Sequence, residues 1–196
     1  MFENAMADSA DTAIRTHEAG RTTTGVHAMM QVIHFDTEVS RPDSAWVRGV
    51  NAFLPASVRV LWAKMVVDEF HARFSATQRS YQYLLANQQT APAIKAQQAG
   101  WYHLPLNVAA MQEAIGYLQG EHDFSAFRAS ECQANSPVRT LNAASIRAHG
   151  DYILFNFSAN AFLQHQVRNM GVALIYVGNG KNSPEFVRDL LEQKDG

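Results

Sequence analysis

The residues of this sequence best suited to chemistry lie in segment 19–28, which contains two glycines, an arginine, three threonines and a histidine. A guanidinium such as that of Arg21 can hold a phosphate through two parallel hydrogen bonds. A hydroxyl such as that of Thr23 becomes a nucleophile only when a base removes its proton, and the sequence places no evident base beside it. Taken alone, the segment is more typical of a turn with solvated hydroxyls.

Arginine dominates the basic residues, because only four of the 16 are lysines. The planar guanidinium binds phosphate and stacks on bases better than an ammonium group does, although a compositional bias of a GC-rich genome would also explain the excess. The net charge of -2 does not itself indicate nucleic-acid binding. Aromatic residues interleave with several arginines, which favours a nucleic-acid surface over a plain charged face. The candidates for that surface are Arg41, Phe70, His71, Arg73, Phe74, Arg79 and Arg128.

The composition indicates a globular protein with one good core or two small ones, since 47% of its 196 residues are hydrophobic. A single cysteine, Cys132, excludes an internal disulfide framework, and residues 1–10 lack the layout of a secretory signal. No apolar run approaches the roughly 20 residues that cross a bilayer. We therefore expect a cytoplasmic protein without a membrane segment. The histidines show no tight metal-binding spacing, and His27 and His34 are more typical of structural hydrogen-bonding groups.

The elements that must position these residues follow from local patterns. Ser40 is predicted to cap a helix that Leu54 and Pro55 end, and segment 58–67 has the β-branched and aromatic content of a strand. The first part of the chain is therefore predicted to contain a helix at 2–10, a loop at 20–25, a strand at 28–36, a helix at 45–52 and a strand at 58–67.

The second part mixes strands and helices without regular alternation, which favours α+β layers over a doubly wound parallel sheet. Asn107 is a predicted N-cap, and alternating apolar residues on both sides of Gly150 predict an antiparallel hairpin. Beyond an irregular segment at 68–76, the predicted elements are a strand at 81–86, a connection at 88–100, a helix at 107–118 that Gly120 stops, a hairpin of 140–148 with 152–159, a helix at 162–177 and a last helix from Ser183.

Segment 20–28, read as Gly-Arg-Thr-Thr-Thr-Gly-Val-His-Ala, resembles the active-site signature of the tRNA pseudouridine synthase A family, Gly-Arg-Thr-Asp-Ala-Gly-Val-His. Segment 70–76, Phe-His-Ala-Arg-Phe-Ser-Ala, also resembles a family element. The likeness covers essentially residues 2–196, while strands that family members carry before and after this span are missing, so we expect a truncated member. Further similar segments, in family order, are 31–35, 49–55, 79–83, 120–128 and 160–170.

The resemblance implies two α+β subdomains with mainly antiparallel sheets, flanked by helices around a basic cleft. We expect them at residues 1–72, which carry loop 19–28, and at residues 73–196. It further implies that the chain isomerises uridine to pseudouridine in the anticodon stem-loop of tRNA, as a homodimer and without cofactor or metal.

The resemblance also assigns catalytic positions. The family nucleophile is an aspartate carboxylate, ionised at neutral pH, and its position is occupied here by Thr23. Arg21 matches the arginine that accompanies it, Tyr81 the tyrosine that stacks on the target base, and Arg168 an arginine of the cleft. The structural alternatives are a solvated loop residue for Arg21, a core tyrosine for Tyr81 and a surface ion pair for Arg168.

Three functional hypotheses remain open from the sequence. The chain is an enzyme impaired at Thr23, a catalytically inactive tRNA-binding homologue or gene fragment, or a general RNA-binding module.

Overall fold

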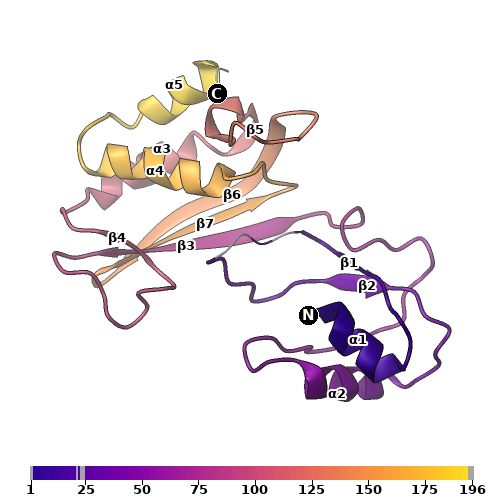
Figure 1. Ribbon diagram of the computed structural model, residues 1–196. Coiled ribbons are helices and arrows are strands. Elements are labelled where there is room, and N and C mark those ends of the chain that lie inside the picture. The colour runs from indigo at the N-terminus through magenta and orange to yellow at the C-terminus, as the bar shows by residue number, and fades with distance from the viewer. Residues whose placement is uncertain (1, 21, 23–24, 194–196) are drawn as a thin grey trace. The chain divides into compact units, whose positions relative to one another are not determined.

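The chain divides into two compact units, Met1–Ala76 and Thr77–Gly196, each with its own hydrophobic core. The structure, a computed structural model, describes residues 2–20, 22 and 25–193 (Figure 1). Within these residues no helix combines the length and apolarity needed to cross a membrane.

The first unit contains α1 (Phe2–Ala10), β1 (Thr16–Glu18), β2 (Ile33–Phe35) and α2 (Asp43–Phe53). The predicted helices are confirmed. β1 and β2 form a two-stranded antiparallel ladder. The two helices pack together over a small apolar core, because their apolar side chains line one face of each. The buried core residues are Ala5, Met6, Ala10, Ile14, Trp46, Val50 and Leu54.

The predicted cap of α2 is wrong. The residue at the N-cap is Pro42, with φ -60° and ψ 146°, and it makes no side-chain capping bond. Ser40 lies two residues before it, too far from the first free N–H groups of the helix to accept from them. The Pro42 carbonyl instead accepts a bond of 2.8 Å from the N–H of Ala45.

The predicted strand at 58–67 is absent, and the one at 28–36 is reduced to β2. The side chain of Asn51 takes the place of a neighbouring strand: its amide donates to the Val60 carbonyl and accepts from the Val60 N–H, both at 2.8 Å. Val58 and Val60 then pack against the core of this unit. Strand propensity therefore did not produce a strand here, because the backbone groups of Val60 bond to a side chain of α2 rather than to a ladder.

The second unit is built on a five-stranded sheet. Its strands are β3 (Arg79–Asn87), β4 (Gly100–Tyr102), β5 (Gly120–Asp123), β6 (Val138–His149) and β7 (Tyr152–Ala159), in the order β4-β3-β7-β6-β5. All neighbours are antiparallel except β3 and β4, which are parallel. The predicted strand and the predicted hairpin are confirmed, whereas β4 and β5 were missed because each is only a few residues long.

Three helices cover one face of this sheet: α3 (Val108–Gly116), α4 (Gln166–Gly178) and α5 (Phe186–Gln193), with a short 3-10 turn at Ser125–Phe127 (Figure 1). The strict alternation along β7 explains the layering, since every second side chain points to the helices. Those side chains are Ile153, Phe155, Phe157 and Ala159, all buried. The α+β class is confirmed.

The local sequence predicts the start of α3 correctly and the start of α4 wrongly. Asn107 caps α3 as predicted, its side chain accepting from the N–H of Ala110. α4 begins at Gln166 rather than at residue 162, because His165 has a left-handed backbone with φ 62°. The buried Leu163 precedes that break, and its N–H donates to the Gln166 side chain at 2.8 Å.

Two glycines of α4 provide a matched test of this packing. A Cβ on Gly178 would lie 2.4 Å and 2.8 Å from side-chain atoms of the fully buried Met111, whereas a Cβ on Gly171 would make ordinary contact with Tyr83 at 3.8 Å. Gly178→Ala should therefore lower the free energy of unfolding by about 1–3 kcal/mol. Gly171→Ala should leave it unchanged or raise it by up to about 1 kcal/mol, through helix propensity. Denaturant melts of both variants check this, and equal effects would contradict the packing described.

Candidate functional site

The loop between β1 and β2 carries the segment in which the sequence predicts a nucleophile. Its base is closed by a bond of 2.9 Å from the Ala19 N–H to the Val32 carbonyl, and the side-chain amide of Gln31 donates to the Gly20 carbonyl. Arg21 and Thr23, two predicted catalytic positions, lie outside the described residues. The two arms of the loop are therefore joined beside the predicted site.

A cluster of three histidines fastens the turn at 70–75 to this hairpin. His17 and His34 are cross-strand partners with rings stacked at 5.0 Å, and the ring of His71 lies 4.5 Å from that of His34. His34 Nδ1 accepts from the Ala72 N–H at 3.1 Å, and His71 Nδ1 accepts from the Arg73 N–H at 3.2 Å. In each bond Nδ1 is the acceptor, so it carries no proton there.

The electrostatics of His34 agree with its role as an acceptor. Partial burial lowers the pKa of His34 below its ordinary value of 6.5, and the neighbouring His71 and His17 add to the shift. Because the charged form is disfavoured in the folded state, His34 is held as a neutral hydrogen-bond acceptor.

Four predicted RNA-binding residues lie on this one turn. Phe70 meets His34 edge-on, with ring centroids 6.1 Å apart, while Phe74 is 78% exposed with its ring 4.3 Å from His71. Arg73 is exposed beside them. The turn thus offers an aromatic face next to a guanidinium, a combination suited to stacking on bases and binding phosphate.

Arg41 is placed differently from the other candidates of this unit. Its guanidinium donates to the carbonyl of Ser9 in α1 and lies 5.7 Å from the ring centroid of Trp46 in α2. These contacts give Arg41 a structural role between the two helices.

In the second unit, Tyr81 lies in the part of β3 that pairs with only one strand among the described residues. That strand is β7, because β4 pairs with β3 only from Leu85 onward. The half-buried Tyr81 ring meets Phe162 edge-on at 5.1 Å. The Tyr81 ring thus packs against an aromatic partner that the sequence had not suggested.

Arg168 stands in the first turn of α4, exposed. Burial raises the pKa of the nearby Tyr83 phenol, and the Arg168 guanidinium opposes that shift, so the two side chains interact electrostatically. Tyr83 lies two residues beyond Tyr81 and therefore on the same face of β3. Sequence reasoning did not single out Tyr83 as a neighbour of Arg168, although the period of two along the strand places it on the face of Tyr81.

The remaining predicted residues of this unit are less closely grouped. Arg79 donates to the carbonyl of Asn160 at 3.2 Å, across the end of the sheet. Arg128 is exposed at the end of the 3-10 turn.

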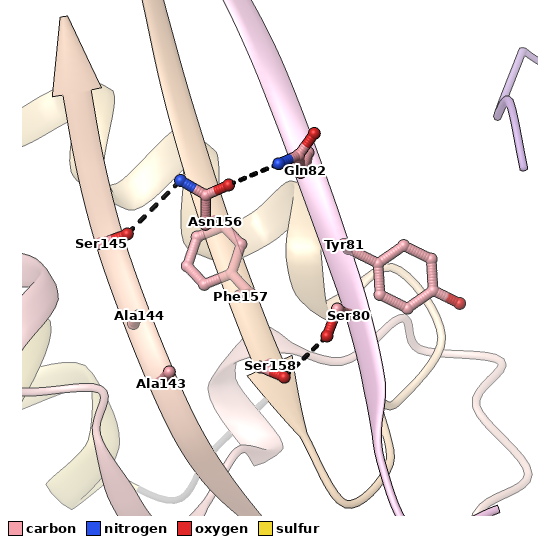
Figure 2. Close-up of a pocket in the computed structure, with 9 residues that line it drawn as sticks. All are labelled: Ser80, Tyr81, Gln82, Ala143, Ala144, Ser145, Asn156, Phe157 and Ser158. Atoms are coloured by element: carbon pink, nitrogen blue, oxygen red, sulfur yellow. Dashed lines mark hydrogen bonds between the residues drawn. The ribbon is translucent and has the colours of Figure 1, made fainter. Parts of the chain in front are cut away.

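The sheet face opposite the helices carries a small hollow lined mainly by hydroxyl and amide side chains (Figure 2). Ser80 and Ser158 share a bond of 2.8 Å, and Gln82 donates to Asn156 at 2.9 Å. The ring of Tyr81 points away from this hollow in the figure. Its polar groups bond to one another and lack a carboxylate or amine, so the hollow is poorly equipped for nucleophilic or acid–base work.

Within residues 2–20, 22 and 25–193, no group of three or more His, Cys, Asp or Glu side chains could hold a metal ion.

Comparison with known proteins gives these positions a context. The sequence profile of the family described as tRNA pseudouridine synthase matches residues 114–196. A protein named tRNA pseudouridine synthase A from Methylobacillus flagellatus is 60% identical over 194 residues, covering 99% of this chain and 74% of the relative. Proteins of the same name from Burkholderia thailandensis and Burkholderia pseudomallei are each 52% identical, covering 99% of this chain and 72% of theirs. The chain belongs to the tRNA pseudouridine synthase A family.

The regions that match other family members lie in both units. The profile match lies wholly in the second unit and includes Arg168 on α4, whereas the alignments with relatives also span the first unit, with the histidine cluster and the β1–β2 loop. The family is thus supported by both halves of the chain.

The histidine cluster predicts that stability depends on pH. The pKa of His34 is lower folded than unfolded, so the unfolded chain takes up a proton first: stability is fully present above about pH 6.5 and falls as the pH drops below it. His34→Asn, whose Oδ1 can replace Nδ1 as acceptor, should flatten this dependence. Denaturant melts at about pH 7.5 and about pH 5.5 measure it. The control is His149→Asn at an exposed site of β6, and an equal flattening there would refute the assignment.

Proposed function

We propose that this chain acts on tRNA as a pseudouridine synthase, isomerising uridine to pseudouridine in the anticodon stem-loop. The observation that carries the proposal is the 60% identity, over 194 residues, with a protein named tRNA pseudouridine synthase A. That likeness spans 194 residues and therefore both compact units.

The reaction sets clear demands on the site. Uracil must leave its ribose, turn and rejoin through a carbon atom, so the product has the same atoms as the substrate and no redox cofactor is needed. A carboxylate suits the covalent step because it is ionised at neutral pH and can both add and leave. Residue 23 is the position at which the family motif places that carboxylate, and here it is Thr23.

The other site residues receive roles that fit their chemistry. Tyr81, held edge-on by Phe162, provides an aromatic face for the target base. Arg21 and Arg168 each provide a guanidinium group for the RNA backbone. The surface proposed to contact RNA also includes Phe70 and the other residues of its turn. Arginines of the second unit extend it further. The proposed phosphate-facing residues beyond that turn are Arg79 and Arg128, whereas the contacts of Arg41 give it a structural role instead.

Threonine at position 23 favours a second candidate function. A hydroxyl without an activating base is a poor nucleophile, so the chain would hold tRNA without isomerising it. Both candidates share the same partner, the same cytoplasmic location and the homodimeric assembly that the family resemblance implies. They differ only in whether product forms.

A single substitution separates the two candidates. Thr23→Asp restores the family carboxylate and should raise the rate of pseudouridine formation by a factor on the order of a thousand or more, since a nucleophile contributes at least that much. The measurement is pseudouridine mapping on unmodified tRNA, with Thr22→Asp as a control that adds the same charge one residue away.

Each outcome decides something. Product at a comparable rate from the unaltered chain would show that Thr23 suffices and would refute the binding-only function. Product from Thr23→Asp, with none from the unaltered chain, would establish the binding-only function for the natural chain. Absence of both product and tRNA binding in every variant would refute the proposal.

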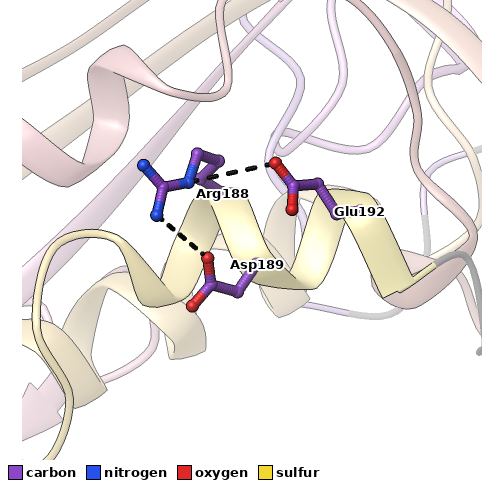
Figure 3. Close-up of polar contacts among 3 residues, drawn as sticks. All are labelled: Arg188, Asp189 and Glu192. Carbon is purple, nitrogen blue, oxygen red and sulfur yellow. Dashed lines mark hydrogen bonds and ion pairs between the residues drawn. The ribbon is translucent and has the colours of Figure 1, made fainter.

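Two arginines on neighbouring helices test the RNA-facing role of Arg168. Arg168→Gln should weaken tRNA binding about tenfold at low salt and lower the slope of log affinity against log salt by about 1. Arg188 on α5 is the control: its guanidinium lies 3.3 Å from Asp189 and 4.0 Å from Glu192 (Figure 3), so Arg188→Gln should change neither quantity. Filter-binding titrations at several salt concentrations measure both, and equal effects would contradict the role of Arg168.

A further inference from the structure

Gln166, at the start of α4, is a polar side chain buried among the apolar residues of the second unit. It is 0% exposed, and its side chain bonds to the backbone of a residue that precedes the helix. Gln166 Oε1 accepts from the Leu163 N–H at 2.8 Å, whereas Gln166 Nε2 has no hydrogen-bond partner in the part of the chain that the structure describes. One half of this buried amide is therefore used and the other half is not.

Packing alone does not account for a glutamine at this position. A buried amide N–H without a partner costs free energy. Methionine, an unbranched apolar side chain of similar length, would fill the same space without that cost. What glutamine adds, and methionine would not, is the bond to Leu163.

The bond spans the sharp turn between β7 and α4. His165, inside this turn, has a left-handed backbone with φ 62°, which is unfavourable for a residue with a side chain. The backbone N–H of Gln166 also donates to the Leu163 carbonyl at 3.2 Å, so Gln166 binds both backbone groups of Leu163. This pair of bonds closes the turn and holds Leu163 in the core.

The turn carries a contact on which the proposed site depends. Phe162 directly precedes Leu163, and its ring meets that of Tyr81 edge-on at 5.1 Å. Arg168 follows Gln166 by two residues in the first turn of α4. Gln166 therefore joins the residue that supports the Tyr81 ring to the helix that presents Arg168.

We infer that Gln166 is a positioning residue of the proposed site: its buried bond to Leu163 keeps Phe162 against Tyr81 and so sets the aromatic face on which the target base stacks. The inference rests on the proposed function and deepens it, because it names a residue that acts through Tyr81 without contacting the RNA. Without this bond the Leu163 N–H loses its acceptor inside the core, and the turn shifts until that group finds another.

The test uses the full chain and stem-loop RNAs that carry 5-fluorouridine at each uridine in turn, because stacking on an aromatic ring shifts the fluorine NMR resonance of the bound base. Gln166→Met should lose most of that shift and bind the RNA about threefold to tenfold more weakly. Its denaturation midpoint should fall less than that of Gly178→Ala, since the lost bond and the removed unpaired amide offset each other.

A double variant tests whether Gln166 acts through Tyr81. Tyr81→Leu should itself remove the fluorine shift, because it removes the ring. Gln166→Met should then cause no further loss of affinity in the Tyr81→Leu background, whereas two independent residues would give additive losses. A merely structural role of Gln166 would also leave the fluorine shift unchanged.

Gln112 on α3 provides a matched control in the same unit. Its Nε2 donates to the Ile146 carbonyl at 3.1 Å, so Gln112→Met also breaks a bond between a glutamine side chain and the backbone. Gln112→Met should leave both the fluorine shift and the affinity unchanged. Denaturant melts are recorded for every variant.

The outcomes separate this inference from the function on which it rests. The positioning role would be overturned, with the proposed function intact, by an unchanged shift in Gln166→Met, by additive losses in the double variant or by an equal loss in Gln112→Met. A fall in the Gln166→Met midpoint as large as that of Gly178→Ala would overturn it too. Binding by the unaltered chain without a fluorine shift would overturn the stacking role of Tyr81 and this inference with it. Absence of RNA binding by the unaltered chain would overturn the proposed function as well.

Discussion

The second unit depends on the pairing of β7 with β3 on one side and β6 on the other. Each alternate side chain of β7 is buried beneath the helices, so this strand supplies the centre of the core as well as the middle of the sheet. The pairing also sets the place of Tyr81, opposite Phe157, and of α4, which rests on the same face. Loss of this ladder would remove the platform for both proposed site residues.

The first unit is held in a different way, by side chains that bond to backbone groups. Asn51 satisfies both backbone groups of Val60, and His34 anchors the turn at Ala72. A two-stranded ladder alone gives little stability in water, so such bonds matter more here than in the five-stranded unit. They also hold the exposed aromatic turn and the base of the β1–β2 loop close to each other within the unit.

Much of the second unit was predictable because its signals are local. The N-cap at Asn107, the alternation along β7 and the hairpin at Gly150 each involve residues close in the chain. Two predictions failed: segment 58–67 has strand composition but its Val60 bonds to Asn51, and α4 starts late because His165 takes a left-handed backbone. Propensity describes a residue's preference, and tertiary contacts can override it.

By itself the sequence determined the family, the α+β class and the identity of the residue at position 23, since motifs and periodicities are read directly from residue order. Only the tertiary structure decided which side chains meet. It brought three histidines from distant segments together, set Phe162 against Tyr81 and turned Arg41 toward α1 and α2. The physical reason is that these contacts join residues far apart in the chain, whose approach depends on how each core packs.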